Sequence, residues 1–184
     1  MRLAAFVTYL AAWAVFAAAA ALNALSKLRQ PATPITLHAP LVIGTLLQFA
    51  GALAVTLSMR RDVPLQPPAP HLVAAMILAP FAAILFIWTL RSQSPSPVSG
   101  LVTGLVTTGA YAILRHPLYL AFLLMLLATG LLVTTIPKLA ASALLYLAGS
   151  ELRLASEEQE LLDRYPHYSD YRQRTRYRYL PGLR

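Results

Sequence analysis

Cysteine is absent from the 184 residues, and charged residues make up only 12% of them. The first absence excludes disulfides, thiolate metal sites and cysteine nucleophiles. The second leaves about half the charge of an ordinary soluble domain, while hydrophobic residues reach 58%. A soluble domain with so little charge would struggle to cover its surface. The composition therefore predicts an integral membrane protein, and the length predicts a single membrane domain over residues 1–184.

Long uncharged runs separate the few clusters of charge. A membrane-crossing helix needs about 20 mostly apolar residues, and a secretory signal core only about 7–15. The first run is too long for a signal core, so we interpret it as a span. We expect an all-α protein with about five transmembrane helices, at approximately 3–25, 39–59, 71–90, 117–136 and 139–155. The fifth is the shortest, because only residues 139–150 are free of charge.

The positions of the basic residues predict the orientation. With five spans, the connectors after the first and third spans lie on the same side as the C-terminal tail. Eleven Lys and Arg fall on that side and four on the other. Because Lys and Arg are enriched on the cytoplasmic side, we expect a cytoplasmic C-terminus.

Polar residues gather in two clusters on this predicted cytoplasmic side, and polar groups near membrane segments are functional suspects. The first cluster, at 105–119, follows a Pro- and Gly-rich stretch that predicts a loop or short helix lining a polar cavity. A structural alternative is that its Arg and His reach the interface while Tyr119 joins an aromatic belt. The second cluster, at 153–171, has two local interpretations. Either Ser156 and Gln159 form a capping box, or the helix is continuous and Arg153 and Glu157 pair at i, i+4.

Together the two clusters resemble the isoprenylcysteine carboxyl methyltransferase and phospholipid methyltransferase family. Its signature Leu-Val-x-x-Gly-x-Tyr-x-x-x-Arg-His-Pro-x-Tyr matches residues 105–119. One helical hairpin later the family has an Arg, an acidic pair, Tyr-x-x-Tyr and a terminal Leu-Pro. These match Arg153, Glu157 with Glu158, Tyr168 with Tyr171, and 180–181. The likeness covers about 105–183, departs at Pro166 where the family often has Gly, and includes residues 1–97 only as spans, so we assign no functional residue there.

The resemblance implies a membrane enzyme that uses S-adenosylmethionine. It implies a cytoplasmic cofactor pocket, built from about 92–119 and 150–184 and closed by the C-terminal tail, with Arg153 facing the substrate. The implied cofactor-binding residues are Thr103, Gly104, Leu105, Val106, Tyr111, His116, Pro117, Leu118, Tyr119 and Glu157.

The chemistry of these residues fits those roles. His116 suits the cofactor's carboxylate, Glu157 suits its ammonium or ribose hydroxyls, and Tyr111 or Tyr119 could face the sulfonium. A carboxylate acceptor needs no base, so Arg153 would only orient it. An amine or thiol acceptor needs a base, for which Glu158 or His116 is a candidate. No metal is expected.

We expect a lipophilic or lipidated acceptor drawn from the bilayer, with carboxyl O-methylation of an isoprenylcysteine-like substrate favoured over N-methylation of phosphatidylethanolamine. An NADPH-dependent reductase of the steroid-reductase type is a second interpretation, although that type has Asn where this chain has Leu118. A non-catalytic scaffold is a third. The expected partners are membrane lipids and not nucleic acid, so the tail arginines (Arg172, Arg174, Arg176, Arg178) are expected on anionic headgroups.

Overall fold

The computed structural model describes residues 7, 10–18, 39–58, 68–93 and 104–180, and every regular element in these ranges is helical. Residues 10–18 form a helical segment. The labelled elements are α2 (Ala39–Ser58), α3 (Ala69–Gln93), the 3-10 helix η1 (Gly109–Ala112), α4 (Pro117–Val133), α5 (Ile136–Arg164) and α6 (Tyr168–Arg174). An isolated parallel bridge joins Leu114 to Tyr177. The expected all-α fold is confirmed for this part of the chain.

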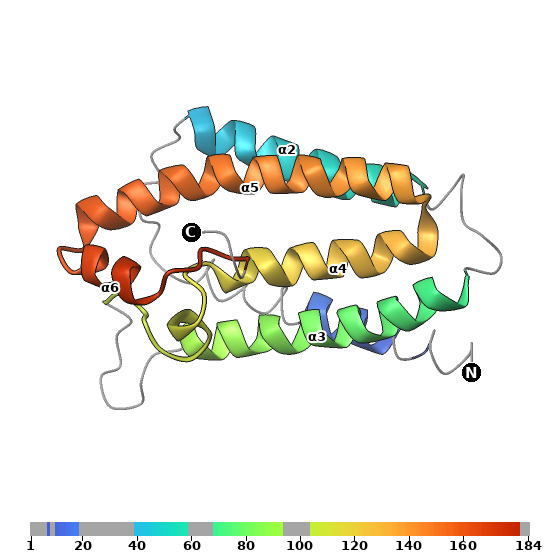
Figure 1. Ribbon diagram of the computed structural model, residues 1–184, viewed down its shortest axis with the longest axis horizontal. Coiled ribbons are helices and arrows are strands. Elements are labelled where there is room, and N and C mark those ends of the chain that lie inside the picture. The colour runs from blue at the N-terminus through green and yellow to red at the C-terminus, as the bar shows by residue number, and fades with distance from the viewer. Residues whose placement is uncertain (1–6, 8–9, 19–38, 59–67, 94–103, 181–184) are drawn as a thin grey trace.

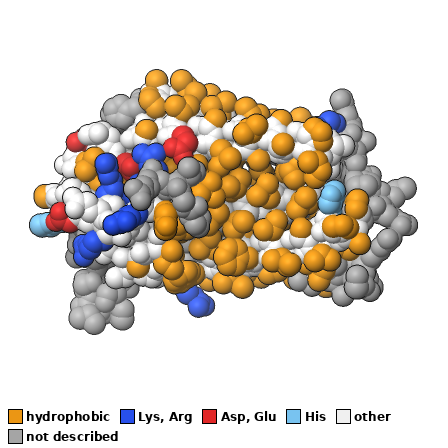
Figure 2. All heavy atoms as spheres, viewed as in Figure 1, with side chains coloured by type: hydrophobic (Ala, Val, Ile, Leu, Met, Phe, Trp, Pro, Cys, Tyr) orange, Lys and Arg blue, Asp and Glu red, His pale blue; other side chains and the backbone are white. Residues whose placement is uncertain are grey.

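The four long helices run along one axis and alternate in direction (Figure 1). Helix α2 lies against α5, α4 is central, and α3 packs on the other side of α4. The starts of α2 and α4 and the ends of α3 and α5 therefore share one end of the bundle, which we call the polar end. Acidic and basic side chains gather there (Figure 2).

Prolines mark where two of these helices begin. Pro117 lies in the first turn of α4 and Pro137 in the first turn of α5, where the missing N–H costs no helical hydrogen bond. The expected span 117–136 is wrong at its C-terminal edge. Helix α4 ends at Val133, with Thr134 as its C-cap, and Thr135 caps the start of α5.

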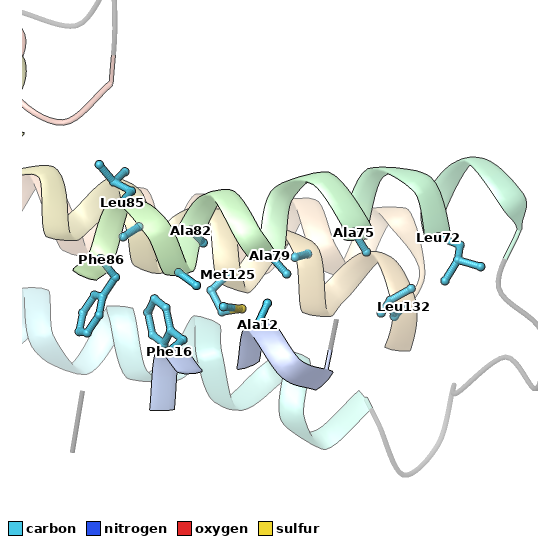
Figure 3. Packing of buried hydrophobic residues seen from close by; sticks show 13 residues of the cluster. Ala12, Phe16, Leu72, Ala75, Ala79, Ala82, Leu85, Phe86, Met125 and Leu132 are labelled. Carbon is cyan, nitrogen blue, oxygen red and sulfur yellow. The ribbon is translucent and has the colours of Figure 1, made fainter. Parts of the chain in front are cut away.

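Two clusters of buried apolar side chains hold the helices together. The first joins residues 10–18 to α3 and α4, as Figure 3 shows, and its tightest ring contact is Phe16 on Phe86, with centroids 4.4 Å apart. The second joins α2, α4 and α5 through Val55, Leu123, Leu126, Leu139 and Tyr146. Since α4 contributes to both, it is the central helix of the described bundle.

The outward faces of the helices carry large apolar side chains, which form a broad belt beside the polar end (Figure 2). Phe49 on α2, Ile77 on α3 and Leu144 on α5 are all exposed. A continuous belt of this kind is unfavourable in water and suited to lipid. Within the described ranges, α2 and α3 are long and apolar enough to cross a membrane, and α4 is a shorter apolar helix of 17 residues.

The five-span count stays a prediction. Most of the expected first span, 3–25, lies outside the described residues, although 10–18 are helical. The expected second and third spans correspond to α2 and α3, and the expected fifth span, 139–155, lies within the 29 residues of α5.

Glycines let α2 and α5 approach each other at backbone contact. A Cβ on Gly44 would lie 2.5 Å from the carbonyl oxygen of Gly149, and one on Gly51 would lie 2.6 Å from that of Ser142. The two contact positions on each helix, 44 and 51 on α2 and 142 and 149 on α5, are seven residues apart. Seven residues are about two helical turns, so the contacts recur on one face of each helix. Close approach through small residues is a common basis of helix association in membranes.

We expect Gly149→Ala to destabilise the protein by about 1–3 kcal/mol. Alanine favours a helix more than glycine does, but the new Cβ would lie 2.9 Å from the backbone nitrogen of Gln48, so α2 and α5 must separate. Thermal unfolding in detergent measures the effect. Gly104→Ala is the matched control, because nothing lies within 4 Å of its Cβ position. Equal melting temperatures for Gly149→Ala and the wild type would contradict the close approach.

Candidate functional site

The loop before α4 takes its shape from Gly109, whose φ of +63° is unfavourable for any residue with a Cβ. A Cβ there would also collide with the hydroxyl of Ser92. That hydroxyl accepts a hydrogen bond from the backbone N–H of Ala110, 3.1 Å away. The glycine of the sequence signature is therefore required for docking the loop on the end of α3, which directs the following residues toward the start of α4.

Arg115 fastens the C-terminal tail to the start of α4. Its side chain is buried, and Nη1 donates to the carbonyls of Thr175 and Arg176, each 2.9 Å away. The backbone N–H groups of Arg115 and His116 donate to two further tail carbonyls, at 3.0 and 2.7 Å. The signature Arg-His pair thus binds the tail through both backbone and side chain.

Glu158 lies between two arginines. Its Oε1 is 2.9 Å from Arg115 Nε, and its Oε2 is 3.1 Å from Arg178 Nη2. Burial raises the pKa of Glu158, but the contact with His116 and the charges of Arg115 and Arg178 outweigh it and lower the pKa to about 2. A carboxylate this acidic does not take up a proton at neutral pH. These ion pairs give Glu158 a structural role in holding the tail, and its role as a base for an amine or thiol acceptor stays a prediction.

Glu157, the neighbouring acid, meets a different set of groups. Its Oε1 accepts from the hydroxyl of Tyr119 at 2.6 Å and from Arg153 Nη2 at 2.9 Å, and its Oε2 lies 3.7 Å from His116 Nδ1. The side chain of Glu157 is 29% exposed, against 4% for Glu158. Of the acidic pair, Glu157 is therefore the more exposed, and a ligand can reach it from solvent. We call His116, Tyr119, Arg153 and Glu157 the Glu157 cluster.

The continuity of α5 decides between the two local interpretations of its sequence. The helix runs unbroken from Ile136 to Arg164, so the capping box at Ser156 is wrong. Arg153 and Glu157 pair at i, i+4, as the alternative predicts. Successive residues of an α-helix point about 100° apart, which explains why Glu157 and Glu158 face different partners.

Arg153 is held from both sides. Its Nη1 donates to Gln48 Oε1 on α2 at 3.3 Å, opposite the contact with Glu157, and its guanidinium carbon lies 5.6 Å from the centroid of the Tyr119 ring. Its Nε is buried without a hydrogen-bond partner among the described residues. Arg153 Nε is therefore a donor that no described residue uses, on a guanidinium whose position is fixed by two other contacts.

Gln48 is a residue of the site that we did not predict from the sequence. Its amide accepts from Arg153 and donates to Ser150 Oγ, 2.8 Å away, so it joins α2 to the site. The available signal was a lone amide side chain in the apolar run of 39–58, where a polar group is costly in lipid.

Tyr111 lies in η1, close to the Glu157 cluster. Its hydroxyl accepts from the amide of Gln93 at the end of α3, and its carbonyl accepts from the hydroxyl of Tyr171, 2.7 Å away. Burial raises the pKa of Tyr111, the bond from Gln93 lowers it, and the charge of Glu157 raises it further. The phenol is thus within electrostatic range of Glu157.

The other expected cofactor residues are spread along the loop and the first turn of α4. Thr103 lies outside the described residues. Gly104 is exposed, and Leu105 and Val106 are half-buried in irregular backbone. In the first turn of α4, the side chains of Pro117 and Leu118 serve packing, since the former is fully buried and the latter lies against the first apolar cluster.

Arg178 departs from the expectation that the tail arginines lie on headgroups. It bridges two acids, with Nη1 2.9 Å from Glu151 Oε2 and Nη2 3.1 Å from Glu158 Oε2. The hydroxyl of Tyr179 also donates to Glu151, at 2.9 Å. Arg178 is therefore an internal ion-pair partner, whereas Arg172, Arg174 and Arg176 are exposed.

The Glu157 cluster offers a carboxylate, a guanidinium, an imidazole and a phenol at the polar end. Two of its buried nitrogens, His116 Nε2 and Arg153 Nε, have no hydrogen-bond partner among the described residues; the former lies 3.4 Å from Glu158 without the alignment of a hydrogen bond. Such donors can bind anionic groups, and the carboxylate can bind a cation. The described ranges contain no group of three or more His, Asp or Glu that could hold a metal ion.

Comparison with protein-family models matches residues 72–163 to the isoprenylcysteine carboxyl methyltransferase (ICMT) family. This is half of the chain, and it contains all of the Glu157 cluster. The match begins in α3, earlier than the resemblance read from the sequence, and ends before α6 and the tail. No curated protein and no solved structure matches the chain. Members of the family are membrane proteins, in agreement with α2 and α3. The chain therefore belongs to the isoprenylcysteine carboxyl methyltransferase family of membrane methyltransferases.

Proposed function

We propose that this protein transfers a methyl group from S-adenosylmethionine to the carboxylate of an isoprenylcysteine-like acceptor at the membrane. The observation that carries the proposal is the convergence of Tyr119, Arg153 and His116 on the Glu157 carboxylate within the family-matched half of the chain. These side chains come from α4, α5 and the residue that caps α4, so tertiary packing brings them together.

The residues of the cluster fit the cofactor. S-adenosylmethionine, when bound, supplies an electrophilic methyl group on a sulfonium. Its amino-acid end carries an ammonium and a carboxylate on one carbon, and the 3.7 Å between Glu157 and His116 places opposite binding groups side by side. Glu157 would hold the ammonium and His116 the carboxylate by charge-assisted hydrogen bonds. The rings of Tyr119 and Tyr111 are the candidates to face the sulfonium.

Arg153 would hold the acceptor. Its Nε is buried and unpartnered among the described residues, while Gln48 and Glu157 fix the other two nitrogens. A carboxylate acceptor is ionised at neutral pH, so no side chain has to remove a proton. An amine acceptor such as phosphatidylethanolamine needs a base. With Glu158 committed to its arginines, only His116 remains of the two candidates, which favours the carboxylate.

We expect Glu157→Gln and His116→Ala each to weaken S-adenosylmethionine binding at least tenfold, about 1.4 kcal/mol. Glu157→Gln removes the charge matched to the ammonium of the cofactor, and His116→Ala removes the imidazole matched to its carboxylate. Calorimetry on folded protein in detergent measures the affinity. Glu160→Gln is the matched control, because Glu160 is exposed on the same helix and, among the described residues, forms an ion pair only with Arg164.

The same titration, run with S-adenosylmethionine and with NADPH, separates the proposed activity from its alternatives. Binding of S-adenosylmethionine that depends on Glu157 and His116 supports the methyltransferase. Binding of NADPH alone would indicate a reductase, and binding of neither would indicate a scaffold.

We further propose that the polar end faces the cytoplasm. Arg91 at the end of α3, Arg115 before α4 and the C-terminal half of α5 share this end, whereas Lys138 lies at the opposite end. The excess of basic residues favours a cytoplasmic location. A reporter active only in the cytoplasm should function when fused after Arg184 and fail when inserted at 61–70. The same signal from both sites would refute the predicted orientation.

A further inference from the structure

A strongly basic cavity lies at the polar end, and its lining residue Glu158 is 3.4 Å from Nε2 of His116 in the Glu157 cluster. Its volume is about 630 Å³, and its lining consists of Arg115, Glu158, Arg172, Gln173, Arg176 and Arg178. The volume falls in the range of small-molecule sites, about 300–1,000 Å³. None of the four Glu157-cluster side chains lines it. The cavity therefore adjoins the proposed cofactor and acceptor positions but is lined by a different set of side chains.

The charges of this basic cavity do not cancel. Glu158 is its one acid, and it is shared between Arg115 and Arg178. Glu151 supplies a second acid to Arg178 from outside the lining. The side chains of Arg172 and Arg176 have no ion pair in the described ranges and are exposed at the cavity. The cavity thus presents at least two uncompensated guanidinium groups, which suit an anion with several oxygens.

Two buried polar atoms provide a second, independent sign of a ligand. The hydroxyl of Tyr168, a residue only 1% exposed, and Nε of Arg178 have no hydrogen-bond partner within the described structure. Burial and the charge of Glu158 raise the pKa of Tyr168 to about 12, against the opposing charges of Arg115, Arg172 and Arg178. Of these two atoms, Arg178 Nε belongs to a residue that lines the cavity, whereas Tyr168 lies outside the lining. Unsatisfied buried donors are rare enough in folded proteins to need an explanation.

We propose that the basic cavity is a binding site for a phosphate group, carried by the headgroup of an anionic membrane lipid. Arg172 and Arg176 provide the charge-assisted contacts, with Arg178 Nε as a further donor from the lining. S-adenosylmethionine, whose net charge is positive, is excluded by the same arginines. The lipid source follows from position, because the basic side chains of the polar end gather beside the apolar belt (Figure 2). Binding there would anchor α6 and the tail at the membrane surface.

The test uses the full chain in detergent and three probes: dihexanoylphosphatidate, glycerol 3-phosphate and dihexanoylglycerol. Native mass spectrometry gives stoichiometry and affinity. We expect one phosphatidate per protein and at least fivefold weaker binding in the double variant Arg172→Gln/Arg176→Gln. The control Arg164→Gln/Arg174→Gln removes the same charge from α5 and α6 at positions outside the lining, and should bind within twofold of the wild type.

Each outcome decides the proposal. Glycerol 3-phosphate binding as tightly as phosphatidate, with the same dependence on Arg172 and Arg176, supports a phosphate site but assigns it a soluble ligand. Equal losses in the two double variants would reduce the site to diffuse charge and overturn it. Binding of dihexanoylglycerol as tight as that of phosphatidate would also overturn it. S-adenosylmethionine binding should be unchanged in both double variants, so failure here is distinguishable from failure of the proposed function.

Discussion

Glu158→Gln should lower the stability of the protein by about 3 kcal/mol, because it leaves buried arginine charge without its acid. Arg115 is 6% exposed, and its remaining partners are neutral tail carbonyls. Within the described ranges, Arg178 then keeps Glu151 as its one acidic partner. The tail should therefore detach more easily, and trypsin should cut faster after the exposed Arg172, Arg174 and Arg176. Thermal unfolding and limited proteolysis in detergent measure the two effects.

The contribution of Glu158 to stability should depend on pH in a defined direction. The folded-state pKa of Glu158, about 2, lies below the ordinary value of 4.5. Its contribution is therefore fully present above about pH 4.5 and is lost as the pH falls toward 2. A shift of this size corresponds to about 3 kcal/mol, in agreement with the expected effect of the substitution. The stability difference between the wild type and Glu158→Gln should accordingly shrink across this acidic window.

Glu160→Gln is the control for Glu158→Gln. It removes an acid two residues along the same helix, where the ion pair with Arg164 is exposed and worth less than about 1 kcal/mol. If the two variants unfold at the same temperature, or if the deficit of Glu158→Gln is unchanged from pH 7 to pH 3, Glu158 does not hold the tail.

Local sequence patterns predicted the parts of the site that depend on local geometry. The pair of Arg153 and Glu157 follows from i, i+4 spacing on one helix. The start of α4 follows from Pro117, and the irregular backbone before it follows from its glycines. These features need only the conformation of a few adjacent residues, which side-chain chemistry determines.

The parts that depend on helix packing could not be predicted in this way. Gln48 reaches Arg153 only because glycines bring α2 and α5 into contact, and nothing near residue 48 specifies that neighbour. The different roles of Glu157 and Glu158 depend on which side of α5 faces the tail. Similarly, Arg178 finds its acids only after the chain has turned back through α6.

The predicted position of the turn between α4 and α5 was wrong for a different reason. Hydropathy is continuous through Ile136, and the capping residues Thr134 and Thr135 are weaker turn signals than Gly, Asn or Pro. The predicted span therefore ended at Ile136, three residues after α4 ends at Val133.

Arg153→Lys should preserve cofactor affinity and lower methyl transfer to a carboxylate acceptor at least tenfold, about 1.4 kcal/mol in the barrier. A lysine can still pair with Glu157 at i, i+4, so the cofactor side of the cluster should survive. It cannot contact Gln48, Glu157 and an acceptor through a rigid planar fork. In the present arrangement those contacts are separate, with Nη1 on Gln48, Nη2 on Glu157 and Nε unpartnered in the described structure.

The acceptor distinguishes orientation from a general loss of charge. A carboxylate presents two oxygens to the guanidinium, whereas the amine of phosphatidylethanolamine presents none, so transfer to a prenylcysteine analogue should fall further than transfer to the phospholipid. Transfer of label from S-adenosylmethionine to both acceptors, alongside calorimetry for cofactor affinity, measures the difference. Arg164→Lys makes the same substitution in an exposed pair of the same helix and should leave both activities unchanged. If Arg153→Lys loses cofactor binding, or retains full activity on the prenylcysteine analogue, Arg153 does not orient the acceptor. Its contact with Gln48 would then serve only to hold α2 against α5.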